Sequence, residues 1–241
     1  MRRDHRPYWM HALWERYENA WTAHFLKPHF EALGQESKIV RPWNVEVFGP
    51  NVRAGKALHV VSRRDQPVSF TVWSPQDAPG RITIGDHCFF AGGCRLLAAC
   101  DITIGDGGLF AKAVTITDSD WHGLYDRVDP RPPAKPVRIG RNVWVGDGAM
   151  ISKGVSIGDN AVIGARSVVT RDIPANVVAA GSPARPVKEL DPDGPFKTRV
   201  DLMGADPVGF ERFMDNAYKA QLKGNSTLGW LRSKLFPRRG D

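Results

Sequence analysis

Residues 139–174 read IGRNVW, VGDGAM, ISKGVS, IGDNAV, IGARSV and VTRDIP when they are set in blocks of six. An aliphatic residue opens every block, the second position is small, and the fifth is small or β-branched. This period is neither the 3.6 of a helix nor the alternation of a half-buried strand. It is typical of a solenoid in which each block forms one short strand and one corner, with its first residue pointing into a narrow interior.

The six-residue register extends toward the N-terminus with interruptions. Apolar residues recur six apart in three earlier groups, which are Ile84, Phe90 and Leu96; Ile104, Phe110 and Ile116; and, more faintly, Phe48, Ala54 and Val60. We therefore expect an all-β solenoid from about residue 45 to residue 180. The interruptions at residues 63–81 and 117–138 are expected to leave it as loops on one face.

The three cysteines follow the same register. Cys88, Cys94 and Cys100 lie six apart, each at the fifth position of its block. That position takes a small inward side chain, so we expect these residues to pack as small hydrophobes. An odd cysteine count without a zinc-type CxxC pair fits a reducing compartment and reduced thiols.

Residues 137–190, VRIGRNVWVGDGAMISKGVSIGDNAVIGARSVVTRDIPANVVAAGSPARPVKEL, resemble the C-terminal coils of the hexapeptide-repeat acyltransferases. The likeness is to the sugar and xenobiotic O-acetyltransferases related to maltose and galactoside acetyltransferase, and it covers more than half of the chain. The resemblance implies three blocks per coil and a left-handed parallel β-helix. It also implies a homotrimer with active sites between subunits and acetyl-coenzyme A as the acyl donor.

The second interruption begins TDSDWHGLYDRVDPRPPAKPV at Thr117 and contains the sole histidine of the latter half of the chain, His122. A loop held at both ends by a rigid solenoid is a suitable place for catalytic groups. The resemblance implies that this loop carries a catalytic histidine. An imidazole with a pKa near 6.5 can take the proton of an attacking hydroxyl, so we expect His122 to be the general base.

Polar neighbours of His122 are candidates for orienting the imidazole or binding the acceptor. Asp118, Asp120 and Asp126 could each serve, although loop aspartates also form turns. Trp121 could stack on a sugar ring or anchor the loop. The oxyanion donor is not identifiable from the sequence.

We expect no bound metal. Carbonic anhydrases share this type of solenoid, and their zinc needs three converging histidines from two subunits. Here only His87 and His122 lie beyond His59.

The resemblance also implies which residues hold the donor. Trp144 and Gly146 would flank the thioester end, and Ala165 and Thr170 would offer backbone contacts to the pantetheine arm. Two cations, Arg171 and Arg185, would approach the phosphates of acetyl-coenzyme A.

The ends of the chain differ from the solenoid. Residues 1–38 carry aromatics at helical spacing and are expected to form a helical cap, with an aromatic sugar platform as the alternative; these aromatics are Trp14, Tyr17, Trp21 and Phe25. Residues 39–190 would form the acyltransferase domain with its loop at 117–138. Residues 191–241 would form a helical, basic extension.

Charge limits the partners. The chain holds 33 Lys+Arg against 26 Asp+Glu, a formal net charge of +7, and residues 207–241 carry 7 basic and 3 acidic side chains. We expect no nucleic-acid partner, because no reading motif or dense basic stripe occurs in the repeats. The final segment LGWLRSKLFPRR is basic and amphipathic, so it either packs on the protein or lies on an anionic lipid surface.

The sequence lacks an apolar stretch of about 18 residues and a signal-peptide pattern, so we expect a cytoplasmic protein, with peripheral contact at the inner membrane surface as an alternative. The expected activity is O-acetylation of a saccharide hydroxyl. Alternatives are N-acylation of an amino sugar, acylation of a lipid-linked acceptor at a membrane, and a non-catalytic trimeric scaffold.

Overall fold

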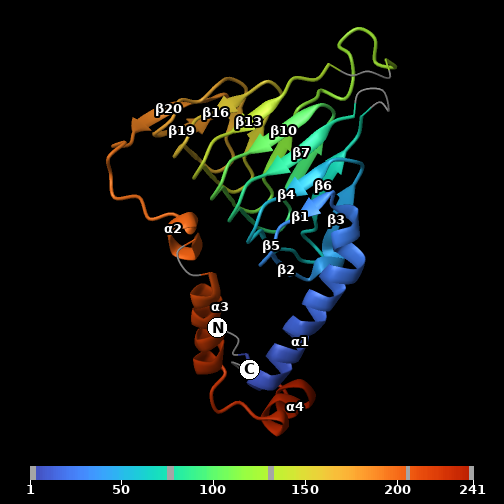
Figure 1. Cartoon of the computed structure of the whole chain (residues 1–241), viewed down its shortest axis with the longest axis vertical. Helices are drawn as coiled ribbons and strands as arrows, with labels where there is room; N and C mark the ends of the chain where they lie inside the picture. Colours follow the sequence, from blue (N-terminus) through green and yellow to red (C-terminus); the bar gives the residue numbers. More distant parts are fainter. Residues whose placement is uncertain (1–3, 75–78, 130–132, 205–206, 239–241) are drawn as a thin grey trace.

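The computed structural model describes residues 4–74, 79–129, 133–204 and 207–238. A three-sided solenoid of short strands forms the body of the molecule (Figure 1). A helical segment precedes it, made of α1 (Tyr8–Trp21), a π-helical turn η1 (Thr22–Leu26) and a 3-10 turn η2 (Lys27–His29). Three helices follow it, which are α2 (Arg199–Gly204), α3 (Pro207–Gln221) and α4 (Thr227–Leu235).

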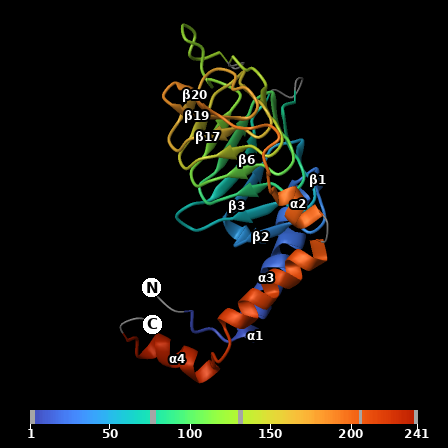
Figure 2. The same ribbon diagram turned by 90° about the vertical axis from the view of Figure 1, so that its left-hand side faces the viewer.

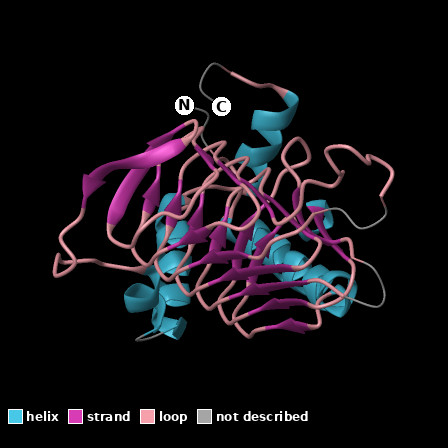
Figure 3. Ribbon diagram, turned by 90° about the horizontal axis from the view of Figure 1, so that it is seen from above, coloured by secondary structure: helices cyan, strands magenta, loops and turns pink. Residues whose placement is uncertain are grey.

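Each coil of the solenoid contributes one strand to each of three sheets, so strands of successive coils are stacked (Figure 3). Sheet A contains β1 (Ala32–Leu33), β4 (Val52–Ala54), β7 (Arg81–Ile84), β10 (Asp101–Ile104), β13 (Val137–Ile139) and β16 (Ser156–Ile157). Sheet B contains β2 (Lys38–Val40), β5 (His59–Val61), β8 (Phe89–Phe90), β11 (Leu109–Phe110), β14 (Trp144–Val145), β17 (Val162–Ile163), β19 (Val177–Gly181) and β20 (Ala184–Glu189).

Sheet C contains β3 (Val45–Phe48), β6 (Val68–Val72), β9 (Arg95–Ala98), β12 (Thr115–Thr117), β15 (Met150–Ile151) and β18 (Val168–Val169). A short 3-10 turn, η3 (Pro42–Asn44), precedes β3. Strands pair in parallel throughout the three sheets, except that β19 and β20 form an antiparallel hairpin.

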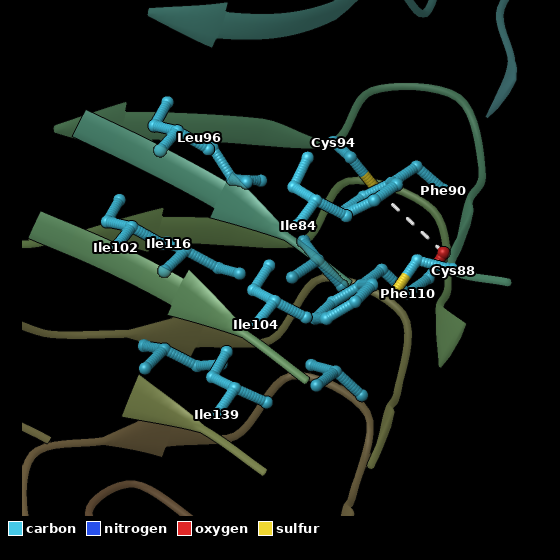
Figure 4. Close-up of a cluster of buried hydrophobic side chains, with 14 of the residues drawn as sticks. Ile84, Cys88, Phe90, Cys94, Leu96, Ile102, Ile104, Phe110, Ile116 and Ile139 are labelled. Atoms are coloured by element: carbon cyan, nitrogen blue, oxygen red, sulfur yellow. Dashed lines mark hydrogen bonds between the residues drawn. The ribbon is translucent and has the colours of Figure 1, made fainter. Parts of the chain in front are cut away.

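The first position of each six-residue block points into the core, as the repeat predicts from Ile84 onward. In sheet A, Ile84, Ile104 and Ile139 are in register, and all are buried (Figure 4). The Phe90 and Phe110 rings of sheet B stack with centroids 4.6 Å apart. The result is one continuous apolar column, which is the main source of hydrophobic stabilisation in a solenoid.

Two expectations for the early coils are wrong. Phe48 does not point inward, because Val47 pairs with the buried Phe70 and Phe48 is 44% exposed. A shift of one residue in a strand reverses the face of every side chain. The interval 63–81 is also not one loop: a turn closed by Arg63 and Gln66 leads into β6, whose inward residues alternate with a period of two.

Burial of Cys88 and Cys94 follows the register as expected, whereas Cys100 departs from it. Cys88 and Cys94 are fully buried, and their thiols donate to the carbonyl oxygens of Gly105 (3.3 Å) and Ala111 (3.0 Å). Burial raises the pKa of each thiol to about 12, so both stay protonated and unreactive at neutral pH. Cys100 is half-buried.

The aromatic stripe of the N-terminal segment does not seal the solenoid. Trp14, Tyr17 and Phe25 are 46%, 55% and 56% exposed. Leu26 and Phe30 close the end of the core instead, at 5% and 7% exposure. The helical period is as predicted, but the stripe faces away from the core. The strands begin at Ala32, earlier than residue 45.

The C-terminal segment returns along the outside of sheet B to the first coils (Figures 1 and 2). Arg199 Nε donates to the carbonyl oxygen of His87 at 2.9 Å, and the guanidinium lies 5.6 Å from the Phe89 ring. Further on, α3 contacts α1 where Tyr8 donates to Asp215. No helix among the described residues is both long enough and apolar enough to span a bilayer.

The contact of α2 with sheet B predicts a pH-dependent stability. Burial, together with the positive charges of Arg199 and Lys38, lowers the pKa of His59 to about 4. The unfolded chain, with an ordinary histidine pKa near 6.5, therefore binds a proton before the folded chain does. Stability should be full above pH 6.5 and should fall as the pH decreases toward 4, by about 2 kcal/mol at pH 5.

Urea unfolding between pH 5 and pH 7.5 tests this expectation. His59→Gln should flatten the pH dependence by about that amount, whereas His24→Gln, at an exposed position, should leave it as in the wild type. An unchanged slope in the His59 variant contradicts the assignment.

Candidate functional site

The loop that carries His122 leaves the solenoid at the corner between sheets C and A, after β12, and returns at β13. It rises from the coils as the green excursion in Figure 1. Its two arms pair at the root, where Ser119 and Ala134 form an antiparallel bridge and Lys135 N donates to the Asp118 carbonyl oxygen at 2.8 Å. Residues 130–132 of the expected loop lie outside the described part of the chain.

Asp118 fixes the loop root to the preceding coil. Its side chain is fully buried and accepts hydrogen bonds from the backbone N–H groups of Ala99 (2.6 Å), Cys100 (2.8 Å) and Asp101 (2.6 Å). Hydrogen bonds to a carboxylate are among the stronger ones in proteins. The structure thus gives Asp118 this anchoring contact in place of the expected contact with the imidazole or the acceptor.

His122 is exposed on the loop, and its imidazole is oriented by a backbone group. Nδ1 lies 3.0 Å from the carbonyl oxygen of Arg127. A carbonyl oxygen can only accept, so Nδ1 carries the hydrogen and Nε2 is the basic nitrogen of the neutral ring. Sequence reasoning missed this partner because a backbone carbonyl has no residue-type signal.

Trp121 anchors the loop. Its backbone has a positive φ of 66°, and its N–H donates to Ser119 Oγ at 3.1 Å. The indole Nε1 donates to Thr117 Oγ1 at 3.0 Å, which turns the ring back toward the loop root. Of the two roles considered for Trp121, these bonds favour anchoring over stacking on a sugar.

The other two aspartates also contact protein groups other than the imidazole. Asp120 forms an ion pair with Lys153, which lies on the next coil. Asp126 Oδ1 accepts from Val128 N at 3.1 Å and closes a turn near the tip. Within the described residues, the hydrogen-bond partner of the imidazole is Arg127 and not one of the three aspartates.

Three of the expected donor-binding residues share the corner between sheets B and C. Trp144 is 53% exposed, and Gly146 and Ala165 follow β14 and β17, which are paired strands. Gly146 N donates to Ile163 O at 2.8 Å, and a Cβ at Gly146 would lie 2.6 Å from Ala165 N. Only glycine permits this close stacking of the coils, so Gly146 has a structural role whatever binds there.

Thr170 and Arg171 lie on a different edge. Ile116, Ile151 and Val169 are in register in sheet C, so the residues that follow them share one corner. This corner is also the root of the His122 loop. Arg171 is exposed there, and Arg185 lies on β20, where Nη1 donates to the Ala184 carbonyl oxygen at 2.7 Å. One protomer therefore brings Thr170 and Arg171 to the edge below the loop and holds Trp144, Gly146 and Ala165 on another edge.

Within the described ranges, no three His, Cys, Asp or Glu side chains gather as a metal site requires.

Comparison with known proteins shows which family the chain is similar to. Residues 136–171 match the model of the bacterial transferase hexapeptide (six repeats). The chain is 43% identical to galactoside O-acetyltransferase of Lactococcus lactis over 184 residues, which cover 73% of this chain and 73% of that protein. It is 47% identical to galactoside O-acetyltransferase of Escherichia coli over 91 residues, 37% of this chain and 45% of that protein.

Among solved structures, a hexapeptide-repeat acetyltransferase of Vibrio cholerae in complex with acetyl-coenzyme A aligns with a TM-score of 0.52 and 25% identity. The alignment covers 72% of this chain and 79% of that one. With the parallel sheets, these matches identify the solenoid as a left-handed parallel β-helix.

In three of the curated relatives, the matched region spans only 45%, 57% and 59% of the relative's own length. The likeness therefore establishes the family of the repeats and leaves the substrate to be argued from the site.

Proposed function

Because the chain belongs to the hexapeptide-repeat acetyltransferase family, we propose that it transfers the acetyl group of acetyl-coenzyme A to a hydroxyl of a saccharide. The observation that carries this proposal is the His122 imidazole, which is exposed on a loop fixed at its root and has Nδ1 held by the Arg127 carbonyl oxygen. A basic Nε2 in an accessible position is what general base catalysis of hydroxyl attack requires.

His122 Nε2 takes the hydroxyl proton as the acceptor oxygen attacks the thioester carbonyl carbon. The C–O bond of the ester forms, the C–S bond breaks, and the imidazolium returns its proton to the departing thiolate. The Nδ1–H bond to Arg127 keeps the ring in one orientation through both transfers and stabilises the positive charge it carries between them. The thioester is already activated, so no covalent enzyme intermediate is needed.

The residues near the last coils suit an anionic donor. Arg171 and Arg185 are exposed cations that would meet the phosphates, and exposed Ala165 and Thr170 would offer backbone contacts to the pantetheine arm. Trp144, with half of its surface free, would pack on the thioester end. These roles are taken from the family resemblance.

We further propose that the protein is a homotrimer. The His122 loop and Arg171 belong to one edge of the prism, whereas Trp144, Gly146 and Ala165 belong to another. Residues on two edges can form one site when a neighbouring protomer supplies the second edge. The trimer thereby completes a donor site that a single protomer leaves divided.

Two other acceptors and a non-catalytic role are the alternatives to a saccharide hydroxyl. An amino sugar would be acylated on nitrogen by the same base. A lipid-linked acceptor is favoured by α4 and the residue after it, which expose Leu228 (80%), Leu235 (68%) and Phe236 (70%) next to basic residues such as Lys234. A basic amphipathic helix of this kind can lie on anionic lipid. A non-catalytic scaffold would show no turnover at all.

Thioester release from acetyl-coenzyme A tests the proposal. The full chain should release coenzyme A in the presence of neutral saccharides, and the product should carry an alkali-labile ester. Faster release with amino sugars and an alkali-stable product would assign N-acylation. Turnover confined to a lipid-linked glycan in anionic vesicles, and lost on truncation after Gly224, would assign the membrane acceptor. No release with any acceptor contradicts the enzymatic proposal.

A further inference from the structure

The first coils carry an exposed aromatic groove that the catalytic argument does not use. The groove has a volume of about 520 Å³ and lies between η1, η3 and β3. Its walls are aromatic and aliphatic, with two polar side chains among them, and the residues used below are Trp21, Phe25, Trp43, Phe48, Glu46 and His29. Its size is in the range of ligand-binding clefts.

The rings of the aromatic groove are exposed but held in place by one another. Phe25, Trp43 and Phe48 are 56%, 39% and 44% exposed. Trp21 lies 4.2 Å from Phe25 and 6.2 Å from Trp43, measured between ring centroids. Large exposed apolar patches on proteins mark binding surfaces, and rings fixed by their neighbours lose little conformational freedom when a ligand packs on them.

The aromatic groove continues along the edge of the solenoid toward the loop. Phe48 contacts Trp73, which is 58% exposed, with ring centroids 4.7 Å apart. Trp73 follows β6, the strand stacked on β3. The two rings thus extend the aromatic surface from one coil to the next.

Strand register relates this surface to His122. Phe48 pairs with Thr71, Thr71 with Leu97, and Leu97 with Thr117 at the loop root. Phe48 and the root of the His122 loop therefore lie on the same edge, three strand spacings or about 14 Å apart. Figure 1 shows this edge rising from β3, past the end of β6, to the loop.

From this alignment we infer that the aromatic groove, continued by Phe48 and Trp73, binds the distal part of an extended saccharide whose acceptor hydroxyl lies at His122. The preferred acceptor is therefore an oligosaccharide or polysaccharide chain, and a monosaccharide, which cannot reach the aromatic groove, is a poorer one. This inference rests on the proposed acetyltransferase function and specifies its substrate class.

The chemistry of the aromatic groove matches such a ligand. The flat C–H faces of pyranose rings pack on aromatic side chains. Glu46 and His29 offer hydrogen-bond partners for hydroxyl groups at the groove wall. An anionic lipid surface would instead favour cations beside the rings, and the carboxylate of Glu46 opposes that.

Acceptor length is the variable that tests the inference. Trp43→Ala and Trp73→Ala should each raise KM for a long neutral oligosaccharide about two- to twelve-fold, which is the loss of one aromatic contact of about 0.5–1.5 kcal/mol. Both variants should keep the kcat of the wild type and its kinetics with a monosaccharide. Trp9→Ala is the matched control, since Trp9 is 55% exposed on α1 and does not line the aromatic groove.

Direct binding separates this inference from the proposed function. Quenching of tryptophan fluorescence by the oligosaccharide should occur in the wild type and weaken in both variants, whether or not acetyl transfer is detected. An oligosaccharide that is acetylated no faster than a monosaccharide, and that does not quench the tryptophan fluorescence, overturns the inference while leaving the proposed function intact. Dissociation of the oligomer by Trp43→Ala in sedimentation also overturns it, because the groove would then be a subunit interface.

Discussion

Replacing His122 by alanine is expected to lower kcat about 10²- to 10⁴-fold, the usual contribution of a general base. The reason is local, because Nε2 is the group placed to take the hydroxyl proton and the Arg127 carbonyl fixes the ring. The affinity for coenzyme A should stay unchanged, since the residues expected to hold the donor lie on the coils. Steady-state kinetics and calorimetric titration with coenzyme A measure the two quantities separately.

Tyr125→Ala provides the matched control for His122→Ala. Tyr125 is fully exposed on the same loop, so its removal tests whether any change in the loop reduces turnover. It should leave kcat within about two-fold of the wild type, as expected for a surface substitution. Wild-type turnover in the His122 variant would exclude the imidazole as the base.

Among single substitutions in the His122 loop, Asp118→Ala should destabilise the protein most. Its carboxylate accepts from three backbone N–H groups, of Ala99, Cys100 and Asp101, and it is fully buried. A buried donor left without an acceptor costs about 1–3 kcal/mol. Since three donors lose their acceptor, we expect the free energy of unfolding to fall by about 3–5 kcal/mol, toward the lower end of their sum. The loop root would lose its tie to the preceding coil, and kcat should fall with it.

Asp126→Ala and Asp118→Asn are the controls for this loss of stability, and both should lose less than Asp118→Ala. Asp126 is exposed and accepts one bond, from Val128 N, so its loss should cost under about 1 kcal/mol. The side-chain amide in Asp118→Asn keeps one acceptor oxygen, so this variant should show an intermediate loss. Denaturant unfolding compares the three variants. Equal stability of Asp118→Ala and Asp126→Ala would show that the buried carboxylate does not hold the loop root.

The fold could be predicted from the sequence wherever the repeat is regular. From Ile84 onward, the first residue of each six-residue block points inward, because the same local requirement recurs in every coil. Ala98 and Ile102, which are also buried, lie in the longer interval between Leu96 and Ile104 and do not follow from the period. Phe48 departs from the six-residue period because the inward residue of β3 is Val47, which precedes the next inward residue, Ala54, by seven positions. The helical period of Trp14 and Tyr17 was visible, but which face meets the core depends on Leu26 and Phe30.

The candidate site also has features that the sequence predicts and features that it does not. The position of His122 in a loop between two inward aliphatics was readable from the sequence. The partners of Asp118 and of His122 itself were not, because they are backbone groups. Asp118 binds N–H groups of residues 99–101, and His122 binds the Arg127 carbonyl. Any residue could supply these backbone groups, so only the folded chain reveals them.

The central claim is that His122 takes the proton of an acceptor hydroxyl as it attacks a thioester held by the solenoid edges. A crystal structure with coenzyme A and an acceptor bound tests this claim most directly. The acceptor hydroxyl should lie within about 3.2 Å of Nε2 of His122, with the thiol beside it. The phosphate end should point toward Arg171 and Arg185 of the same protomer or of its neighbour. Coenzyme A bound along an edge that no His122 loop reaches would contradict the account.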